Sequence, residues 1–194
     1  MVSLYVYDTK NIQDVLLTSN LDYHCNLYKN ELKRKISRYA YYLLSVKLKE
    51  QGYDPSLITF TKSGKGIHDD IYFSISHSKS YISIAISNSN IGVDVEDILS
   101  LDRLKLASKI LNEEELDIFN ARLDKCEYLT EKWTLKEAFG KYLGEGITSD
   151  VLKSTIVGHT YNVLGAMVSI YPSMPNKFYL NEREIELWKI SKRS

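Results

Sequence analysis

Two short segments of the sequence carry acidic and basic side chains at spacings that suit phosphate chemistry. Asp94 and Glu96 are two residues apart in a segment of alternating polarity, and such residues point to the same face of an extended strand. Further along the chain, Glu137 and Lys141 are four apart in a helical pattern, which places them on one helix face with Lys136 beside them. Three carboxylates could bind a divalent metal ion while the lysines face a phosphate group.

A serine-rich segment around His77 adds further groups that bind phosphate. Ser76 and Ser78 flank the histidine just before a turn, so two hydroxyls, backbone N–H groups and an imidazole come together. Each segment alone is explained more simply, since an isolated pair of acids caps an exposed strand and a lone histidine is usually structural. The three segments together favour a phosphate-handling site.

The order of the predicted elements indicates an α+β fold rather than alternating strands and helices. Period-two alternation predicts strands, which cover residues 4–7, 71–76, 82–87, 91–96, 154–157, 161–171, 177–180 and 184–190. Steps of three or four predict helices, which cover residues 30–52, 113–121 and 126–143. A capping box of Asn112 and Glu115 starts the second helix, and Gly144 ends the third. Short polar connections between residues 71 and 96 predict an antiparallel three-stranded meander.

The composition is that of a folded protein without overall charge. The 194 residues can bury a core in one domain or in two small packed halves. Lys plus Arg and Asp plus Glu number 25 each, so we expect neither nucleic acid nor a membrane surface as partner. Cys25 and Cys126 form no paired motif, which suits a reducing compartment. Because no signal peptide or membrane-spanning stretch is evident, we expect a cytoplasmic protein.

The motifs follow one another in the order and spacing of a known enzyme family. They are Gly64-Lys65, Phe73-x-Ile75-Ser76-His77-Ser78, Gly92-x-Asp94-x-Glu96 and Trp133-x-x-Lys136-Glu137-Ala138-Phe139-x-Lys141-x-x-Gly144-x-Gly146. In this arrangement, between Ser63 and Thr148, the sequence resembles the 4'-phosphopantetheinyl transferases of the surfactin-activating type. One departure is Gly66, because a proline commonly follows the Gly-Lys pair in that family.

The resemblance implies a fold and a reaction. The fold is a pseudo-dimer of two similar α/β halves, which we expect at residues 1–91 and 92–194 of one compact, monomeric unit with the active site between them. The reaction moves the 4'-phosphopantetheine arm of coenzyme A to a serine of an apo acyl or peptidyl carrier protein, and releases adenosine 3',5'-bisphosphate.

The resemblance also implies the catalytic groups. Asp94, Glu96 and Glu137 look like the ligands of Mg²⁺, with Mn²⁺ as the other candidate metal. Lys141 looks like the lysine that faces the pyrophosphate. Glu137 is also the first candidate for the general base that takes the serine proton, a role that competes with metal ligation. The sequence leaves these two roles of Glu137 open.

The remaining implied contacts are those with the coenzyme and the carrier. Lys65, Ser76 and His77 look like contacts to the adenosine and its 3'-phosphate, and Arg38 is a candidate for the same phosphate from its place in the first long helix. Basic residues that could face an acidic carrier are Arg103, Lys105, Lys109, Arg122 and Lys125.

Two other functions stay open at this point. One is a coenzyme A or nucleotide-binding protein of the same fold without turnover. The other is a metal-dependent phosphohydrolase that uses the same carboxylates on another phosphodiester and releases its product to water.

Overall fold

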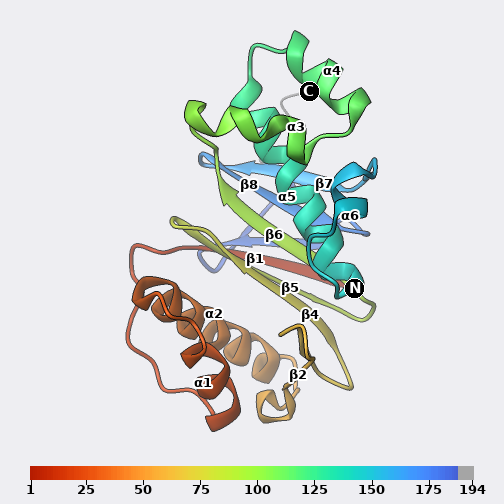
Figure 1. The fold of residues 1–194 in the computed structure, drawn as a ribbon. Coiled ribbons are helices and arrows are strands. Elements are labelled where there is room, and N and C mark those ends of the chain that lie inside the picture. Colours follow the sequence, from red (N-terminus) through yellow and green to blue (C-terminus); the bar gives the residue numbers. More distant parts are fainter. Residues whose placement is uncertain (188–194) are drawn as a thin grey trace.

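The structure, a computed structural model, describes residues 1–187, and these form helices and three sheets (Figure 1). The strands are β1 (Val2–Asp8), β2 (Thr59–Phe60), β3 (Gly66–Ile67), β4 (Tyr72–His77), β5 (Tyr81–Ser87), β6 (Gly92–Asp97), β7 (His159–Val163), β8 (Ala166–Tyr171), β9 (Lys177–Leu180) and β10 (Arg183–Ile185). The α-helices are α1 (Ser19–Asn26), α2 (Glu31–Glu50), α3 (Ala107–Ile110), α4 (Glu113–Ala121), α5 (Lys125–Leu143) and α6 (Ser149–Lys153), and the 3-10 helices are η1 (Pro55–Leu57) and η2 (Leu101–Leu106). The strand orders are β10-β9-β1-β5-β4, β6-β8-β7 and β2-β3. The predicted α+β class is confirmed.

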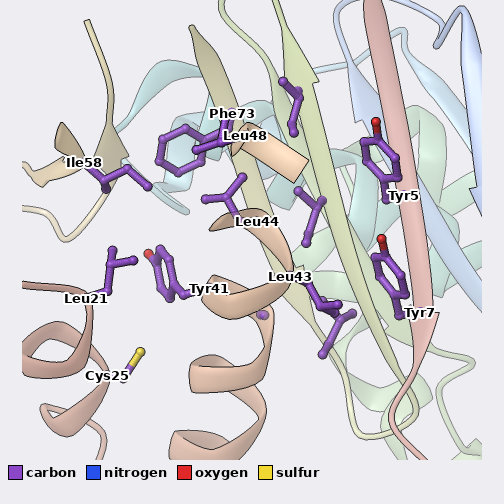
Figure 2. Close-up of a cluster of buried hydrophobic side chains, with 14 of the residues drawn as sticks. Tyr5, Tyr7, Leu21, Cys25, Tyr41, Leu43, Leu44, Leu48, Ile58 and Phe73 are labelled. Atoms are coloured by element: carbon purple, nitrogen blue, oxygen red, sulfur yellow. The ribbon is translucent and has the colours of Figure 1, made fainter. Parts of the chain in front are cut away.

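The five-stranded sheet is covered on both faces. Alternate side chains of β1 point to opposite faces, and each set is buried. Tyr5 and Tyr7 pack with Leu44 of α2 in one buried cluster (Figure 2). Leu4 and Val6 pack in a second cluster with side chains of β6 and β8. Helices α1 and α2 therefore cover one face of this sheet, and the three-stranded sheet covers the other (Figure 1).

The three-stranded sheet turns its outer face toward α5, which packs along β6 and β8. Val93 belongs to the cluster between the two sheets, so the alternation along β6 turns Asp94 and Glu96 toward the helix. Helix and strand lie in close backbone contact at Gly92, where an added Cβ would lie 1.9 Å from the carbonyl oxygen of Ala138. Glycine at this position thus fixes how closely α5 lies over the two carboxylates.

The predicted three-stranded meander is wrong. β4 and β5 pair with each other as expected, but β6 pairs with β8 in the other sheet. β6 nevertheless lies beside β4, where the backbone N–H of Val93 donates to the side-chain hydroxyl of Ser74 over 3.0 Å. A period-two pattern identifies a strand but carries no information on its partner, and this separation of β4 from β6 places the acidic motif at a junction of two sheets.

Two predicted strands in the second half of the chain are also wrong. The segment 161–171 is the hairpin of β7 and β8, because Leu164 and Gly165 turn the chain with φ angles of 49° and 93°. Residues 154–157 follow α6 without forming a strand, and the Ser154 hydroxyl donates to the carbonyl oxygen of Asp150 at the end of that helix. Of the predicted strand 184–190, β10 covers residues 184 and 185, residues 186 and 187 are not in a strand, and residues 188–190 lie outside the described part of the chain.

Several local predictions are confirmed. Asn112 and Glu115 form both hydrogen bonds of the capping box at the start of α4. Helix α5 ends at Gly144, which adopts the left-handed conformation with a φ of 81°. Across the part of the chain that the structure describes, no helix combines the length and the apolar character needed to cross a membrane.

Candidate active site

A cavity of about 410 Å³ opens where α1, α2, β4 and the C-terminal end of α5 meet. It is lined by His24, Tyr28, Ser37, Tyr41, Ser63, Gly64, Lys65, Gly66, Phe73, Ser74, Ile75, Ser76, His77, Lys141, Gly144, Glu145 and Gly146. Two of the sequence motifs, Gly64-Lys65 and the segment around His77, therefore share one cavity with the end of the Trp133 motif. A volume in this range suits a small-molecule ligand of nucleotide size.

Asp94 connects the acidic motif to the wall of this cavity. Its Oδ1 accepts a hydrogen bond from the Ser76 hydroxyl at 2.6 Å and lies 2.8 Å from the ammonium of Lys141. Asp94 is 5% exposed, so this carboxylate depends on these two partners for compensation of its charge. The same ammonium lies 3.4 Å from the carbonyl oxygen of Ile75. Strands β4 and β6 and helix α5 thus meet at one carboxylate.

Glu96 and Glu137 lie within electrostatic reach of Asp94. Burial and the negative charges of Asp94, Asp97 and Glu137 together raise the pKa of Glu96 to about 7. Burial and the charge of Asp94 likewise raise the pKa of Glu137 to about 7, whereas the cation of Lys141 lowers it. Mutually repelling carboxylates of this kind gain from a nearby cation.

The three carboxylates fit a magnesium ion in their chemistry, since Mg²⁺ prefers oxygen ligands and binds through few carboxylates. Within residues 1–187, however, no group of three or more His, Cys, Asp or Glu side chains is arranged closely enough to hold a metal ion. The donor type fits a divalent cation, and the structure brings the acidic residues into one neighbourhood without gathering them into a coordination cluster.

His77 and Lys65 stand in less polar surroundings than the sequence suggests. Burial lowers the pKa of His77 to about 4, with a further contribution from the cations of Lys141 and Lys33, so the imidazole is neutral at pH 7. Burial also lowers the pKa of Lys65. Its ammonium donates to the carbonyl oxygen of Tyr142 over 3.3 Å, which ties the 63–66 loop to the end of α5.

Arg38 points to a different neighbour. Its guanidinium pairs with Asp22 of α1 and donates to the carbonyl oxygen of Val15. A contact between Arg38 and a phosphate in the cavity would require this pairing to change. The sequence could not indicate the pairing of Arg38 with Asp22, because α1 was not among the predicted helices.

The basic residues between the two main motifs fall into two groups. Arg122 pairs with Asp124 over 2.6 Å, and Arg103 lies 3.8 Å from Asp102. Lys105 and Lys109 are exposed, and the ammonium of Lys125 lies over the ring of Phe119.

The sequence motifs missed the aromatic side of the cavity. The imidazole of His24 stacks on Phe60 with ring centroids 3.7 Å apart, and Tyr28 meets His77 edge-on at 6.5 Å. Tyr41 of α2 also lines the cavity. The sequence prediction covered the helix at residues 30–52 but assigned no role to Tyr41, because no spacing in the sequence distinguishes a core position from a cavity wall.

Comparisons with known proteins match this region of the chain. Residues 90–163 match the family model described as the 4'-phosphopantetheinyl transferase superfamily. A 4'-phosphopantetheinyl transferase from Aneurinibacillus migulanus is 36% identical over 95 residues, which cover 46% of this chain and 40% of that protein. A holo-[acyl-carrier-protein] synthase from Streptococcus mutans is 40% identical over 65 residues, which cover 30% of this chain and 55% of that protein.

A longer match extends the similarity into the N-terminal part. An L-aminoadipate-semialdehyde dehydrogenase-phosphopantetheinyl transferase from Candida glabrata is 26% identical over 162 residues, which cover 76% of this chain and 63% of that protein. The chain spans less than two thirds of the length of each of these relatives. The matches confirm the resemblance that the ordered motifs indicated.

Proposed function

We propose that this chain, whose residues 90–163 match the family model of the 4'-phosphopantetheinyl transferase superfamily, transfers the 4'-phosphopantetheine arm of coenzyme A to a serine of an apo acyl or peptidyl carrier protein. The serine oxygen attacks the β-phosphorus of the coenzyme in line, the new O–P bond forms, and adenosine 3',5'-bisphosphate leaves. Such a reaction needs positioning of both reactants and stabilisation of negative charge on the phosphate oxygens.

One observation carries this proposal, namely the shared contact of Asp94 with Ser76 and Lys141 beside the cavity. The contact joins three motifs that lie far apart in the sequence. It brings a cation and a carboxylate together at the wall of the cavity, which supports this position for the phosphates of the coenzyme. Lys141 can thereby face a phosphate oxygen of the coenzyme as charge develops there.

Asp94, Glu96 and Glu137 are the proposed ligands for Mg²⁺, or for Mn²⁺ in its place. Support comes from the oxygen donors and from the raised pKa values of Glu96 and Glu137, since carboxylates that repel one another favour a divalent cation between them. The bound ion would withdraw negative charge from the pyrophosphate.

Glu137 is also the proposed base for the proton of the attacking serine. A general base works best when its pKa lies near the working pH, and burial raises the pKa of Glu137 to about 7. A metal ion on the same carboxylate would lower that pKa, so the two proposed roles of Glu137 compete.

Lys65, Ser76 and His77 are the proposed contacts to the adenosine and its 3'-phosphate, supported by their places in the cavity wall. Arg38 is proposed for the same phosphate, to which it would turn from Asp22 when the coenzyme binds. We further propose that residues 1–91 and 92–194 are the two halves of a pseudo-dimer with the coenzyme between them. In such a pseudo-dimer the hairpin of β9 and β10, although part of the second half of the chain, would extend the sheet of the first half, because β9 pairs with β1.

The carrier protein is the proposed macromolecular partner. Lys105 and Lys109 are exposed and could face the acidic surface of a carrier, and Arg103, Arg122 and Lys125 are proposed for the same surface. A monomer and a cytoplasmic location remain predictions of the same proposal.

The test is an intact-mass measurement on several apo carrier proteins after incubation with this protein, coenzyme A and Mg²⁺. A gain of about 340 Da on a carrier, the mass of one transferred arm, supports the transferase. Cleavage of the coenzyme without a change in carrier mass would favour a phosphohydrolase. Tight coenzyme binding with neither outcome would favour a binding protein without turnover.

A further inference from the structure

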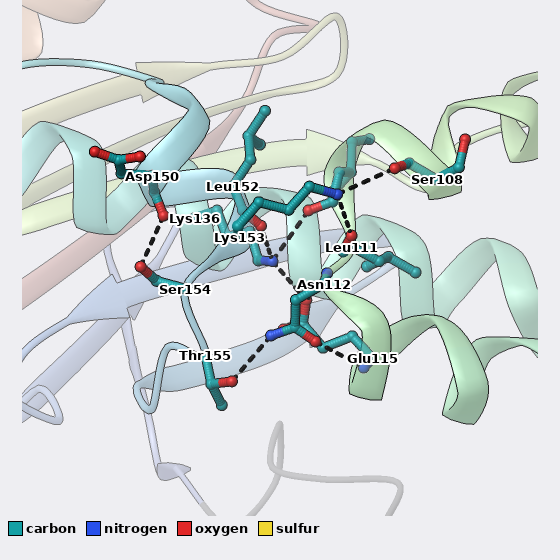
Figure 3. Close-up of polar contacts among 11 residues, drawn as sticks. Ser108, Leu111, Asn112, Glu115, Lys136, Asp150, Leu152, Lys153, Ser154 and Thr155 are labelled. Carbon is teal, nitrogen blue, oxygen red and sulfur yellow. Dashed lines mark hydrogen bonds and ion pairs between the residues drawn. The ribbon is translucent and has the colours of Figure 1, made fainter.

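Lys136 is a charged side chain enclosed in the protein, although the sequence places it next to Glu137. It is 1% exposed, and its ammonium donates to three acceptors (Figure 3). These are the carbonyl oxygen of Ile110 at 3.0 Å, Oε2 of Glu115 at 2.5 Å and the carbonyl oxygen of Leu152 at 2.5 Å. An ammonium has three protons, so its hydrogen-bonding capacity is filled.

Glu115 is held just as firmly on the other side of the pair. Its side chain is 5% exposed, and Oε2 also accepts from the backbone N–H of Asn112 at 3.1 Å as part of the capping box of α4. The amide of Asn112 donates in turn to the hydroxyl of Thr155 at 2.9 Å. The carboxylate is therefore fixed to the start of α4 independently of its contact with Lys136.

The acceptors of Lys136 come from three different helices. Ile110 ends α3, Glu115 lies in the first turn of α4, and Leu152 lies in α6. One side chain of α5 is thus bound to the three helices α3, α4 and α6, and Figure 3 shows the dashed contacts around Lys136.

This contact fixes the rotation of α5 about its own axis. Successive residues of an α-helix are about 100° apart around the axis, so the direction of Lys136 determines the direction of Glu137. On the strand side, the approach of Gly92 to the carbonyl oxygen of Ala138 fixes the depth of the helix. Rotation and depth together set where the carboxylate of Glu137 lies relative to Asp94.

We infer that Lys136 and Glu115 are positioning residues, whose buried ion pair holds Glu137 in place for the reaction. The catalytic part of this inference rests on the proposed function. A buried ion pair can often be replaced by apolar side chains of similar volume without loss of stability. Stability alone therefore does not require a charged pair here, whereas three directed hydrogen bonds restrain a helix far more narrowly than an apolar contact.

The test is the double variant K136M/E115M, in which both charges are removed together and no unpaired charge is left in the interior. We expect its melting temperature to match or exceed that of the wild type, and its affinity for coenzyme A to be unchanged within about twofold. The kcat for carrier modification should fall by about 10- to 100-fold, as expected from a displacement of up to about 1 Å of a catalytic group. The affinity for Mn²⁺ alone, measured by electron paramagnetic resonance, should fall by about tenfold, because a displaced Glu137 binds the ion less well.

Lys153 offers a matched control in the same layer of helices. Its ammonium donates to the carbonyl oxygens of Ser108 at 3.1 Å and Leu111 at 2.7 Å, so these hydrogen bonds link α6 to the end of α3 rather than to α5. The K153M variant should lower the melting temperature while kcat and Mn²⁺ affinity stay at their wild-type values. The comparison of the two variants distinguishes an effect on the packing of α3 and α6 from an effect on the position of α5.

A conservative change at Glu115 tests geometry with the charge retained. E115D keeps the carboxylate but is shorter by one methylene group, so it leaves no unpaired charge in the interior. Positioning predicts that E115D lowers kcat and weakens Mn²⁺ binding, because the shorter side chain must draw Lys136 out of place. A folded E115D protein with wild-type values of both would overturn the inference.

The double variant gives the remaining outcomes. A folded K136M/E115M protein with wild-type kcat and wild-type Mn²⁺ affinity would overturn the inference. If the double variant does not fold, the kcat and the Mn²⁺ affinity of E115D decide. A further outcome is that the wild type modifies no carrier while the double variant binds Mn²⁺ more weakly than the wild type does. In that case the proposed function fails, but the positioning of the metal-binding carboxylates stands.

Discussion

Replacement of Lys141 by methionine should destabilise the metal-free protein, because it leaves a buried carboxylate without its cation. The ammonium lies 2.8 Å from Asp94, whose side chain is 8% exposed. Removal of one partner from a buried ion pair costs about 3–5 kcal/mol. The loss here should be smaller, since the Lys141 side chain is 28% exposed and the hydroxyl of Ser76 still donates to Asp94. We expect about 2 kcal/mol, or a fall in Tm of roughly 4–8 °C.

The assay is urea unfolding in EDTA at pH 7 for the wild type, K141M and the double variant D94N/K141M. The double variant no longer buries an unpaired charge, so it should recover part of the lost stability. Added Mg²⁺ should stabilise K141M more than it stabilises the double variant, because only K141M retains the carboxylate of Asp94 for the ion.

Two results would refute this reasoning. If K141M is as stable as the wild type in EDTA, the ion pair contributes nothing and Asp94 is compensated in another way. If Mg²⁺ stabilises K141M and D94N/K141M equally, Asp94 is not a ligand of the ion.

Three further predictions concern the same region. Gly92→Ala should cost at least about 3 kcal/mol, because its Cβ would lie 1.9 Å from the carbonyl oxygen of Ala138; a loss below about 1 kcal/mol in urea unfolding would contradict this packing. Glu137→Gln should abolish carrier modification while circular dichroism and Tm stay near the wild type, and near-normal turnover would remove Glu137 from the mechanism. Burial lowers the pKa of His77 to about 4, so the unfolded chain takes up a proton between pH 6.5 and 4 that the folded protein does not. From pH 7 to pH 5 this histidine should cost up to about 2 kcal/mol of stability, whereas the raised pKa values of Glu96 and Glu137 act in the opposite direction. The free energy of unfolding of His77→Gln, minus that of the wild type, should therefore rise by up to about 2 kcal/mol from pH 7 to pH 5 in denaturant titrations; an unchanged difference would show that His77 does not titrate in this way.

Local features of the fold could be predicted from the sequence because their causes are local. The capping box of Asn112 and Glu115, the end of α5 at Gly144 and the alternation of β4 and β5 each depend on residues that are neighbours in the chain. The shared face of Asp94 and Glu96 on β6 follows from the same period of two.

The arrangement of these elements could not be predicted, because it depends on residues that are distant in sequence. The pairing of β6 with β8 and the parallel pairing of β9 with β1 leave no local signal. The helical spacing of Lys136 and Glu137 likewise did not indicate which side chain would be buried. Lys136 became part of the interior because Glu115 and two carbonyl oxygens surround it, and only the folded structure brings those acceptors together.

The most direct test of the account is a crystal structure of the protein with coenzyme A and Mn²⁺, with anomalous scattering used to locate the metal. The account predicts a Mn²⁺ ion bound by Asp94, Glu96 and Glu137, with the pyrophosphate of the coenzyme as a further ligand and Lys141 facing a phosphate oxygen. An occupied coenzyme site with the metal bound elsewhere, or with the three carboxylates turned away from the pyrophosphate, would contradict it.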